Sequence, residues 1–337
     1  MPSSVSSPAR KKIQSMAELG DLGEAAAKLI AADELVLTCH VGPDGDALGS
    51  MLAVAVAAAT AGTKVFPSFG PPFVLPPSYR FLPVELLVEP DEVPAQPKLM
   101  LSFDAAGLDR LSGMAGPATR ADCLIVLDHH ATGSGGFGHL NLIDVEAAAT
   151  AEIAHALITA AGWPVDQTVA QCLLTGLVTD TGRFQYSNTR PQTLRLAAQL
   201  VAAGAQPDVI GRHLYEETPF GYLAVAARVL DRARLEPAAG LVWSALYQSD
   251  LTEIGIGMAD TDPLIDLVRL PLEARVAMLL KEQEDGGFKG SLRSRGEVDV
   301  GLIAARHGGG GHHNAAGFSH PGPVPVIVEA VVGQLAG

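Results

Sequence analysis

The chain has 337 residues, 48% of them hydrophobic, and it carries 23 Lys and Arg against 37 Asp and Glu, a net charge of −14. A chain of this length can bury a full core and typically folds as about two domains. The acidic charge argues against a protein that follows long nucleic acids, because that binding depends on a basic surface. A small phosphate ester is still compatible with it, since bound cations can supply a local positive field.

The N-terminal segment, one apolar stretch and the cysteines indicate where in the cell the protein is expected. Residues 1–18, rich in Ser and Pro, predict a disordered tail without the apolar core of a signal peptide. The apolar stretch Ala47–Ala61 is shorter than the ~20 residues that span a bilayer, so we expect no membrane association. The cysteines Cys39, Cys123 and Cys172 are far apart and form no C-x-x-C pair. Buried thiols in a reducing compartment are therefore expected, and we predict a cytoplasmic protein.

The first half of the chain alternates strand-like and helix-like segments. Short apolar runs bounded by turn residues predict strands at Leu35–Cys39, Lys64–Ser68, Leu99–Phe103 and Cys123–Leu127. Helices are predicted at Asp21–Ala32, Ala47–Ala61, Thr150–Ala161 and Thr168–Val178. This alternation predicts an α/β domain with a parallel sheet and flanking helices, which we place at residues 19–215.

The second half changes character at about Pro191. Helices are predicted at Gln192–Ala203, Asp208–Leu214 and Tyr222–Arg234, and residues 216–237 are interpreted as a helical linker. A smaller mixed α/β domain is expected at 238–337. Its predicted strands are Leu241–Leu246, Ala274–Lys281 and Gly287–Arg293, and its predicted helices are Asp260–Leu270 and Val300–Ala305.

Polar residues cluster where the first strands end. His40, Asp44 and Asp46 occupy seven residues directly after the first strand. Further candidates lie just after the later predicted strands or after a predicted helix: Asp104, Asp128, His129, His130 and Asp180. Because ligand crevices of open α/β sheets lie at the carboxyl ends of the strands, we expect these groups to meet.

Carboxylates with imidazoles suit divalent cations, and the imidazoles favour Mn²⁺ over Mg²⁺, with Co²⁺ as another candidate. Two such ions suit the cleavage of a phosphate ester. Each piece also has a plainer interpretation. Asp46 could simply cap the following helix, and Asp180 could be an ordinary turn residue before Gly182. The ordered conjunction of four such sites beside apolar segments favours a metal centre.

The ordered motifs resemble those of the DHH phosphoesterases. They are H-V-G-P-D-G-D, S-F-D, V-L-D-H-H and L-V-T-D-T-G, and a glycine-rich run, G-G-G-G-H-H-N-A-A-G, follows near the C-terminus. The resemblance extends from about His40 to Phe318. It is strongest to members that act as oligoribonucleases and as phosphatases of 3′-phosphoadenosine 5′-phosphate (pAp), some of which also cleave cyclic dinucleotides.

The resemblance implies a role for each residue at the metal centre. His40, Asp44 and Asp104 would hold one cation. The second cation would be held by Asp46, Asp104, His129 and Asp180, with Asp104 shared. His130 would contact the scissile phosphate or assist the leaving oxygen, and Asp128 would orient the histidines.

The same resemblance assigns substrate binding to the second domain. Arg293 would suit a terminal phosphate, and the loop Gly309–His312, with Gly310 and Gly311, would approach it through backbone N–H groups. Plainer interpretations are a surface arginine and a flexible turn. The family often has Arg or Lys where this chain has His313, and Thr or Ser where Ala47 follows Asp46.

The sequence thus predicts a two-metal hydrolase of short RNA and pAp. The alternatives are a phosphodiesterase of cyclic di-AMP or linear diadenylate, an inorganic pyrophosphatase, and an inactive nucleotide-binding regulator. A homodimer is a further expectation, although Val225 and Val229, which could form an interface, fit internal packing better.

Overall fold

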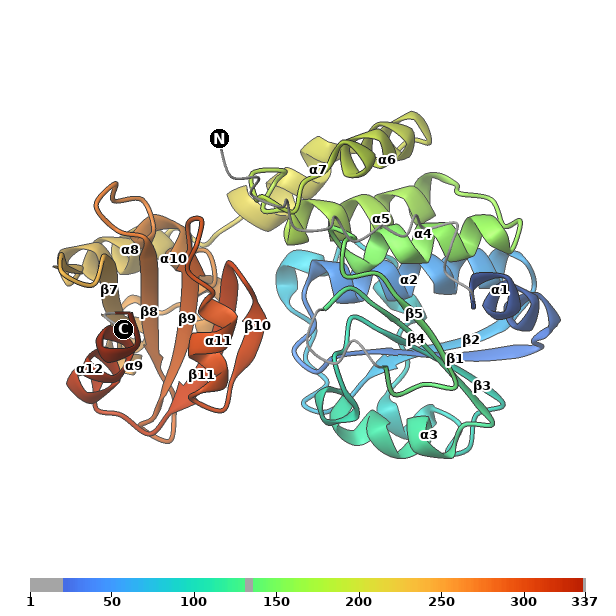
Figure 1. The fold of residues 1–337 in the computed structure, drawn as a ribbon, viewed down its shortest axis with the longest axis horizontal. Helices are drawn as coiled ribbons and strands as arrows, with labels where there is room; N and C mark the ends of the chain where they lie inside the picture. The colour runs from blue at the N-terminus through green and yellow to red at the C-terminus, as the bar shows by residue number, and fades with distance from the viewer. Residues whose placement is uncertain (1–20, 131–135, 336–337) are drawn as a thin grey trace, which may run out of the picture. The chain divides into compact units, whose positions relative to one another are not determined.

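The chain divides into two compact units, Met1–Gly211 and Arg212–Gly337 (Figure 1). The computed structural model describes residues 21–130 and 136–335. The predicted tail at 1–18 lies outside the described residues. The functional division of the chain at 215 and 237 stays a prediction.

The first unit is built on a parallel sheet with the order β2-β1-β3-β4-β5. Its strands are β1 (Glu34–Cys39), β2 (Lys64–Phe69), β3 (Leu99–Phe103), β4 (Cys123–Asp128) and β5 (Leu140–Ile143). The predicted α/β class with a parallel sheet is confirmed, and β1, β3 and β4 lie side by side. Edge strand β5 was not predicted, because its four residues are too few to give a clear apolar pattern.

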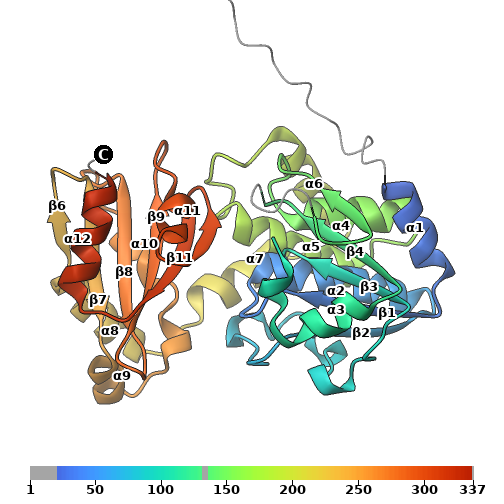
Figure 2. The same cartoon turned by 60° about the horizontal axis from the view of Figure 1, so that its bottom comes forward.

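Helices cover both faces of this sheet, as the turned view in Figure 2 also shows. The helices of the first unit are α1 (Leu22–Ala31), α2 (Gly45–Thr60), α3 (Ala115–Arg120), α4 (Thr150–Ala160), α5 (Gln167–Asp180), α6 (Pro191–Ala202) and α7 (Pro207–Gly211). Helix α2 is almost wholly buried. It approaches α5 so closely that a Cβ at Gly49 would lie 2.4 Å from the Cys172 carbonyl oxygen. Small residues thus set the distance between two helices that both carry site residues.

Short 3₁₀ helices occupy the connections on either side of β3. Their bounds are Pro77–Tyr79, Val84–Leu86, Pro90–Glu92 and Leu108–Met114.

The second unit has a mixed sheet with the order β10-β11-β9-β8-β7-β6. Its strands are β6 (Arg234–Glu236), β7 (Leu241–Leu246), β8 (Val276–Glu282), β9 (Phe288–Ser294), β10 (Gly310–His312) and β11 (Ala315–His320). Strands β7 and β8 pair in parallel and the other neighbours pair antiparallel. The smaller mixed α/β domain expected here is confirmed.

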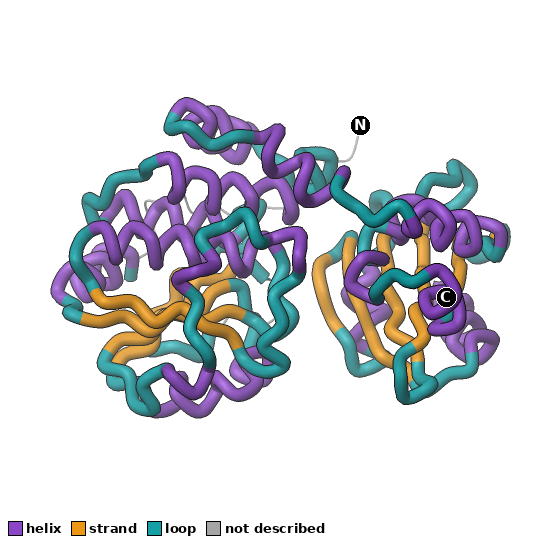
Figure 3. The backbone as a smooth tube through the Cα atoms, turned by 180° about the vertical axis from the view of Figure 1, so that it is seen from behind, coloured by secondary structure: helices purple, strands orange, loops and turns teal. Residues whose placement is uncertain are grey.

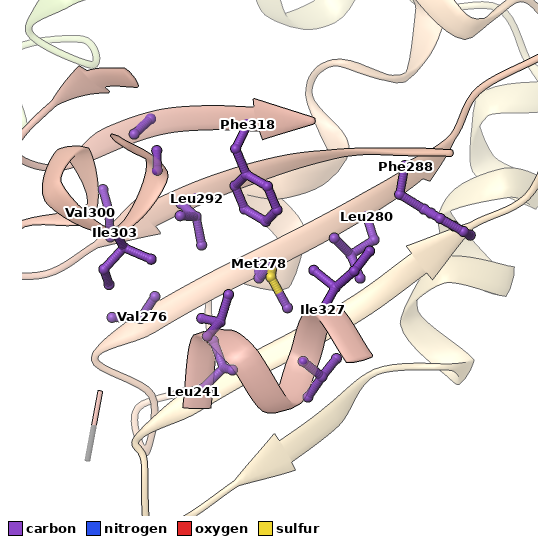
Figure 4. Close-up of a cluster of buried hydrophobic side chains, with 14 of the residues drawn as sticks. Leu241, Val276, Met278, Leu280, Phe288, Leu292, Val300, Ile303, Phe318 and Ile327 are labelled. Atoms are coloured by element: carbon purple, nitrogen blue, oxygen red, sulfur yellow. The ribbon is translucent and has the colours of Figure 1, made fainter. Parts of the chain in front are cut away.

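Helices also lie on both faces of the second sheet, as the tube in Figure 3 shows. The helices of the second unit are a π-helix at Arg212–Glu216, α8 (Gly221–Asp231), α9 (Gln248–Ile254), a 3₁₀ helix at Met258–Thr261, α10 (Leu264–Val268), α11 (Val300–Ala305) and α12 (Val324–Leu335). One core lies between the sheet and α11 and α12, where Leu292, Phe318 and Ile327 point toward Met278 (Figure 4). The other lies under α8, α9 and α10 and takes in Val225 and Val229, both fully buried.

Three predicted elements of the second half differ from the structure. The helix expected at Asp208–Leu214 ends as α7 at Gly211 and continues as a π-helix. The helix expected at Asp260–Leu270 is broken, because Pro263 separates a 3₁₀ turn from α10. The expected loop Gly309–His312 is mostly strand β10, which pairs with β11.

The glycines of this hairpin have a packing reason. A Cβ at Gly309 would lie 2.1 Å from the Gly317 carbonyl oxygen, and one at Gly311 would lie 2.5 Å from that of Ala315. Strand β11 therefore leaves no room for a side chain at either position. Within the described residues, no helix is long and apolar enough to cross a membrane.

Candidate metal centre

The ends of three neighbouring strands bring the candidate residues together. His40 follows β1, Asp104 follows β3, and Asp128 ends β4. Helix α2 begins at Gly45 and brings Asp46, while α5 ends at Asp180. Residues spread over 140 positions of the chain therefore meet at one edge of the sheet, as the strand-end rule predicts.

One group consists of His40, Asp44 and Asp104, whose ligand atoms lie within 4.8 Å of one another. His40 Nε2 is 3.8 Å from Asp44 Oδ1 and 3.6 Å from Asp104 Oδ2. Its other ring nitrogen, Nδ1, contacts the Val41 carbonyl oxygen at 3.1 Å. The backbone contact fixes the ring so that Nε2 faces the two carboxylates.

A second group consists of Asp46, His129 and Asp180. His129 Nε2 is 3.9 Å from Asp46 Oδ2 and 3.0 Å from Asp180 Oδ2. As in the first group, the Nδ1 atom of the histidine contacts a backbone oxygen, here that of Ala147 at 3.1 Å. Both groups thus present the same kind of oriented imidazole.

Asp104 links the two groups. Its Oδ1 lies 3.5 Å from His129 Nε2, while its Oδ2 faces His40. The residue has a φ of 56°, in the left-handed region that Asp tolerates better than most side chains. Backbone strain of this kind concentrates at functional sites. Here it occurs at the residue whose two carboxylate oxygens face His40 and His129.

Asp128 and His130 form a pair beside these groups. Asp128 Oδ1 contacts His130 Nδ1 at 2.7 Å and accepts hydrogen bonds from the backbone N–H groups of His129 and His130. This carboxylate is therefore held against the D-H-H turn itself. His130 Nδ1 also lies 3.7 Å from Asp104 Oδ1, and Asp104, His129 and His130 make a third potential ligand group.

The sequence did not reveal the residues that hold Asp46. Asp46 Oδ2 accepts a hydrogen bond from the Thr150 backbone N–H at 2.6 Å, and Oδ1 accepts from Ala151 N–H and from the Ser50 hydroxyl, both at 3.0 Å. The Thr150 hydroxyl also donates to Asp104 Oδ1 at 2.9 Å. The first turn of α4 thus orients carboxylates of both groups through donors that α4 cannot satisfy internally.

The capping interpretation of Asp46 is wrong. Asp44 is the N-cap of α2, and its Oδ1 accepts from the N–H groups of Asp46 and Ala47, both at 3.1 Å. Asp46 instead faces α4. The cap stabilises the turn that presents His40 and Asp44 together.

Burial and close charges shift the pKa values at this centre. Burial opposes the protonated form of His40, but the contacts with Asp104 and Asp44 outweigh it and raise its pKa. For His129, burial acts in the same way and Asp180 outweighs it. Burial, with Asp104 and Asp180 nearby, raises the pKa of Asp46. Buried carboxylates placed this close together favour a positive charge beside them.

This donor set fits divalent cations. Carboxylate oxygens and imidazole nitrogens are ligands for Mn²⁺ and related ions, and each group offers three of them within one coordination sphere. Asp46 and Asp104 lie within ion-pair distance of histidines. A cation would replace protons on those rings as the compensating charge.

The predicted substrate residues lie in the second unit. Arg293 is on β9, and its Nη1 donates to the Leu292 carbonyl oxygen at 3.0 Å. Gly309, Gly310 and Gly311 lie at or beside β10. His313 Nε2 contacts the Gly296 carbonyl oxygen at 3.0 Å, so the residue that departs from the family pattern has a local structural contact.

Models of two known domains match the chain. One, described as the DHH family N-terminal domain, matches residues 34–177, and the other, the DHHA1 domain, matches residues 249–335. The chain is 33% identical to the bifunctional oligoribonuclease and PAP phosphatase NrnA of Thermus thermophilus over 289 residues, 86% of this chain and 84% of that protein. It is 27% identical to the protein of the same name from Bacillus subtilis, over 85% of this chain and 89% of that one.

Solved structures show the same fold. An exopolyphosphatase-related protein from Bacteroides fragilis superposes with a TM-score of 0.84 at 23% identity, over 97% of both chains. RecJ of Thermus thermophilus in complex with Mn²⁺ superposes with a TM-score of 0.55 at 16% identity, over 96% of this chain and 55% of that one. The two domain models match the chain one after the other, and the alignment with the Thermus relative spans most of both chains. This chain therefore belongs to the DHH family of metal-dependent phosphoesterases.

Proposed function

We propose that the chain hydrolyses short oligonucleotides to mononucleotides and pAp to AMP, with two divalent cations, Mn²⁺ foremost. The observation that carries the proposal is the pair of ligand groups joined by Asp104. Two cations held close together suit the displacement of an ester oxygen from phosphorus. The activities named for the Thermus and Bacillus relatives point to the same substrates.

Each residue has a proposed role in this reaction. His40, Asp44 and Asp104 hold one cation, and Asp46, Asp104, His129 and Asp180 hold the other. When bound, the cations supply the charge that activates water and neutralises the phosphoryl oxygens. His130, fixed by Asp128 through its Nδ1 atom, contacts the scissile phosphate or assists the leaving oxygen.

The second unit is proposed to bind the rest of the substrate. Arg293 takes a phosphate through its planar guanidinium, and the β10 hairpin with Gly309, Gly310, Gly311 and His312 adds backbone donors. Packing requires the absence of a side chain at Gly309 and Gly311, whereas no atom would lie within 4 Å of a Cβ at Gly310. Gly310 is therefore the glycine of this hairpin that has room for an approaching ligand.

Turnover by purified protein tests the proposal. With Mn²⁺ we expect mononucleotides from dinucleotides and inorganic phosphate from pAp, and neither product after chelation of the metal. Absence of both products in the presence of Mn²⁺ contradicts the proposal. Parallel assays with Mg²⁺ and Co²⁺ rank the cations.

A second candidate activity is hydrolysis of cyclic di-AMP or linear diadenylate. A relative from Geobacillus thermodenitrificans named as the cyclic-di-AMP phosphodiesterase GdpP is 30% identical over 197 residues, 57% of this chain and 29% of that protein. Turnover of both diadenylates beside pAp ranks these activities, and a pyrophosphate assay tests the pyrophosphatase alternative. The homodimer and the cytoplasmic location stay predictions, and light scattering on the purified protein tests the first.

A further inference from the structure

Residues 147–151, where the chain enters helix α4, form a buried segment here called the α4 entry. The α4 entry contacts three of the four residues proposed to hold the second cation: His129, Asp46 and Asp104. These contacts involve a carbonyl oxygen, two backbone N–H groups and the Thr150 hydroxyl. The position of this one segment therefore sets the positions of three proposed ligands at once.

The fourth proposed ligand, Asp180, lies at the end of a different helix, α5, and Asn188 joins it to the α4 entry. Asn188 Nδ2 donates to the Ala148 carbonyl oxygen at 3.0 Å and to the Asp180 carbonyl oxygen at 3.1 Å. Because both partners are acceptors, the amide nitrogen faces them, and it has one hydrogen for each. The Asp180 carbonyl oxygen is one of the last of α5, which have no partner within the helix. Asn188 thus fastens the end of α5 to the segment that orients the other three ligands.

A strained turn brings Asn188 back to Asp180. Gly182, Arg183 and Phe184 have φ angles of 54°, 65° and 63°, in the left-handed region. Arg183 and Phe184 carry side chains that this region disfavours. Such strain persists where surrounding contacts hold the backbone in place. The two hydrogen bonds of Asn188 are contacts of this kind.

The residues after Asn188 have their own attachment to α4. Arg190 Nη2 donates to Glu152 Oε2 at 3.1 Å, and the Thr193 hydroxyl donates to Glu152 Oε1. Glu152 lies in the first turn of α4 and is only 2% exposed. Separation of this pair would leave a buried carboxylate without its partner, so the attachment resists displacement. Loss of the Asn188 amide should therefore release the end of α5 while this part of the chain stays in place.

We propose that Asn188 is a positioning residue for a single cation, the one assigned to His129 and Asp180. This inference rests on the proposed two-cation function. The other ligand group has separate supports, since His40 contacts the Val41 carbonyl oxygen and Asp44 accepts from N–H groups at the start of α2. Loss of the Asn188 amide should weaken one cation site and leave the other unchanged.

Two backgrounds isolate the two cation sites in the full chain. His40→Ala keeps the ligands of the second group, and Asp180→Asn keeps those of the first. Asn188→Leu keeps the approximate size of the side chain and removes both N–H donors. In titration calorimetry with Mn²⁺, we expect Asn188→Leu to raise Kd by about 10-fold to 100-fold in the His40→Ala background. In the Asp180→Asn background, the same substitution should leave Kd within about twofold.

A matched control is Asn141→Leu, because the Asn141 amide holds the Gly138 backbone instead. It should leave Kd within about twofold in both backgrounds. Asn188→Ala, which removes the amide without adding bulk, repeats the comparison if Asn188→Leu does not fold.

Equal effects of the Asn188 substitution in the two backgrounds, or no effect in either, overturn the proposal. Failure of both Asn188 variants to fold also overturns it, because the residue would then serve stability alone. A wild-type chain that binds fewer than two Mn²⁺ contradicts the proposed two-cation function instead. The comparison in the His40→Ala background then decides the role of Asn188 by itself.

Discussion

Both units bury carboxylates, but they compensate the charge differently. In the first unit, Asp46 and Asp104 are 0% and 2% exposed and face histidines, backbone N–H groups and hydroxyls. In the second unit, Asp250 is 1% exposed and is held by Arg228 and Arg232. Arginines of the same unit compensate the charge of Asp250, whereas Asp46 and Asp104 lie among imidazoles, a kind of group that also binds metal ions. Burial alone does not mark a functional carboxylate, and the identity of its partners does.

The units also differ in what shapes their proposed binding surfaces. The metal centre depends on side chains that strand ends and helix ends bring together. The β10–β11 hairpin depends on close packing of backbone against backbone, because Gly309 and Gly311 have no space for a Cβ. Substitutions should therefore separate chemistry in the first unit from stability and binding in the second.

The largest expected effect is at Asp104, which lies beside a histidine of each ligand group. Asp104→Asn removes a carboxylate that faces His40 and His129. We expect turnover to fall by about 10³-fold or more, because the remaining ligands cannot hold both cations close together. Asp122→Asn, at an exposed residue before β4, is the matched control in steady-state assays. Retention of wild-type turnover by Asp104→Asn contradicts the shared-ligand assignment.

Two adjacent glycines test the role of backbone in the second unit. In Gly309→Ala the new Cβ meets the Gly317 carbonyl oxygen, whereas in Gly310→Ala it meets no atom within 4 Å. We expect urea unfolding to show a loss of about 1–3 kcal/mol for the first and less than about 1 kcal/mol for the second. Mn²⁺ binding should be unchanged in both. Equal stability losses would mean that the hairpin does not pack as described.

A smaller effect is expected where α4 supports the metal centre. Thr150→Val keeps the side-chain shape but removes the hydroxyl that donates to Asp104 Oδ1. We expect Mn²⁺ affinity to fall about tenfold, the effect typical of a group that orients a ligand. Thr150→Ser keeps the donor and should stay within about threefold. Titration calorimetry with Mn²⁺ compares them, and identical affinities for the two variants exclude the positioning role.

The smallest effect concerns acid stability of the second unit. Although burial opposes it, Arg232, the Tyr247 backbone N–H and Arg228 lower the pKa of Asp250 from 3.8 to about 2. A lowered pKa stabilises the fold above pH ~4, and this contribution is lost as the pH falls toward 2. After allowance for solvent screening by the half-exposed arginines, we expect on the order of 1 kcal/mol. In Asp250→Asn the pH dependence of urea unfolding between pH 4 and 2 should flatten, and an unchanged slope contradicts the assignment.

Much of the first unit could be predicted from its sequence, because local patterns and one rule of architecture suffice there. Short apolar strands ending in His40, Asp104 and Asp128 imply a common edge, provided that the strands are parallel neighbours. The strand order β2-β1-β3-β4-β5 meets that condition. The family motifs then supplied the metal assignments, which local chemistry alone left open.

What the sequence could not show depends on tertiary contacts. Thr150 looks like an ordinary helix start, and its approach to Asp46, 104 residues away, arises only when α4 packs beside α2. Gly309 and Gly311 suggest a flexible loop, and only the close approach of β11 shows that neither position has room for a side chain.

Metal stoichiometry tests the central claim most directly. After equilibration with Mn²⁺ and removal of free metal, elemental analysis of the full chain should give about two Mn²⁺ per chain, as two ligand groups joined by one carboxylate require. His40→Ala, which removes a ligand from one group only, should retain about one. A wild-type value of one or none would contradict a two-cation centre.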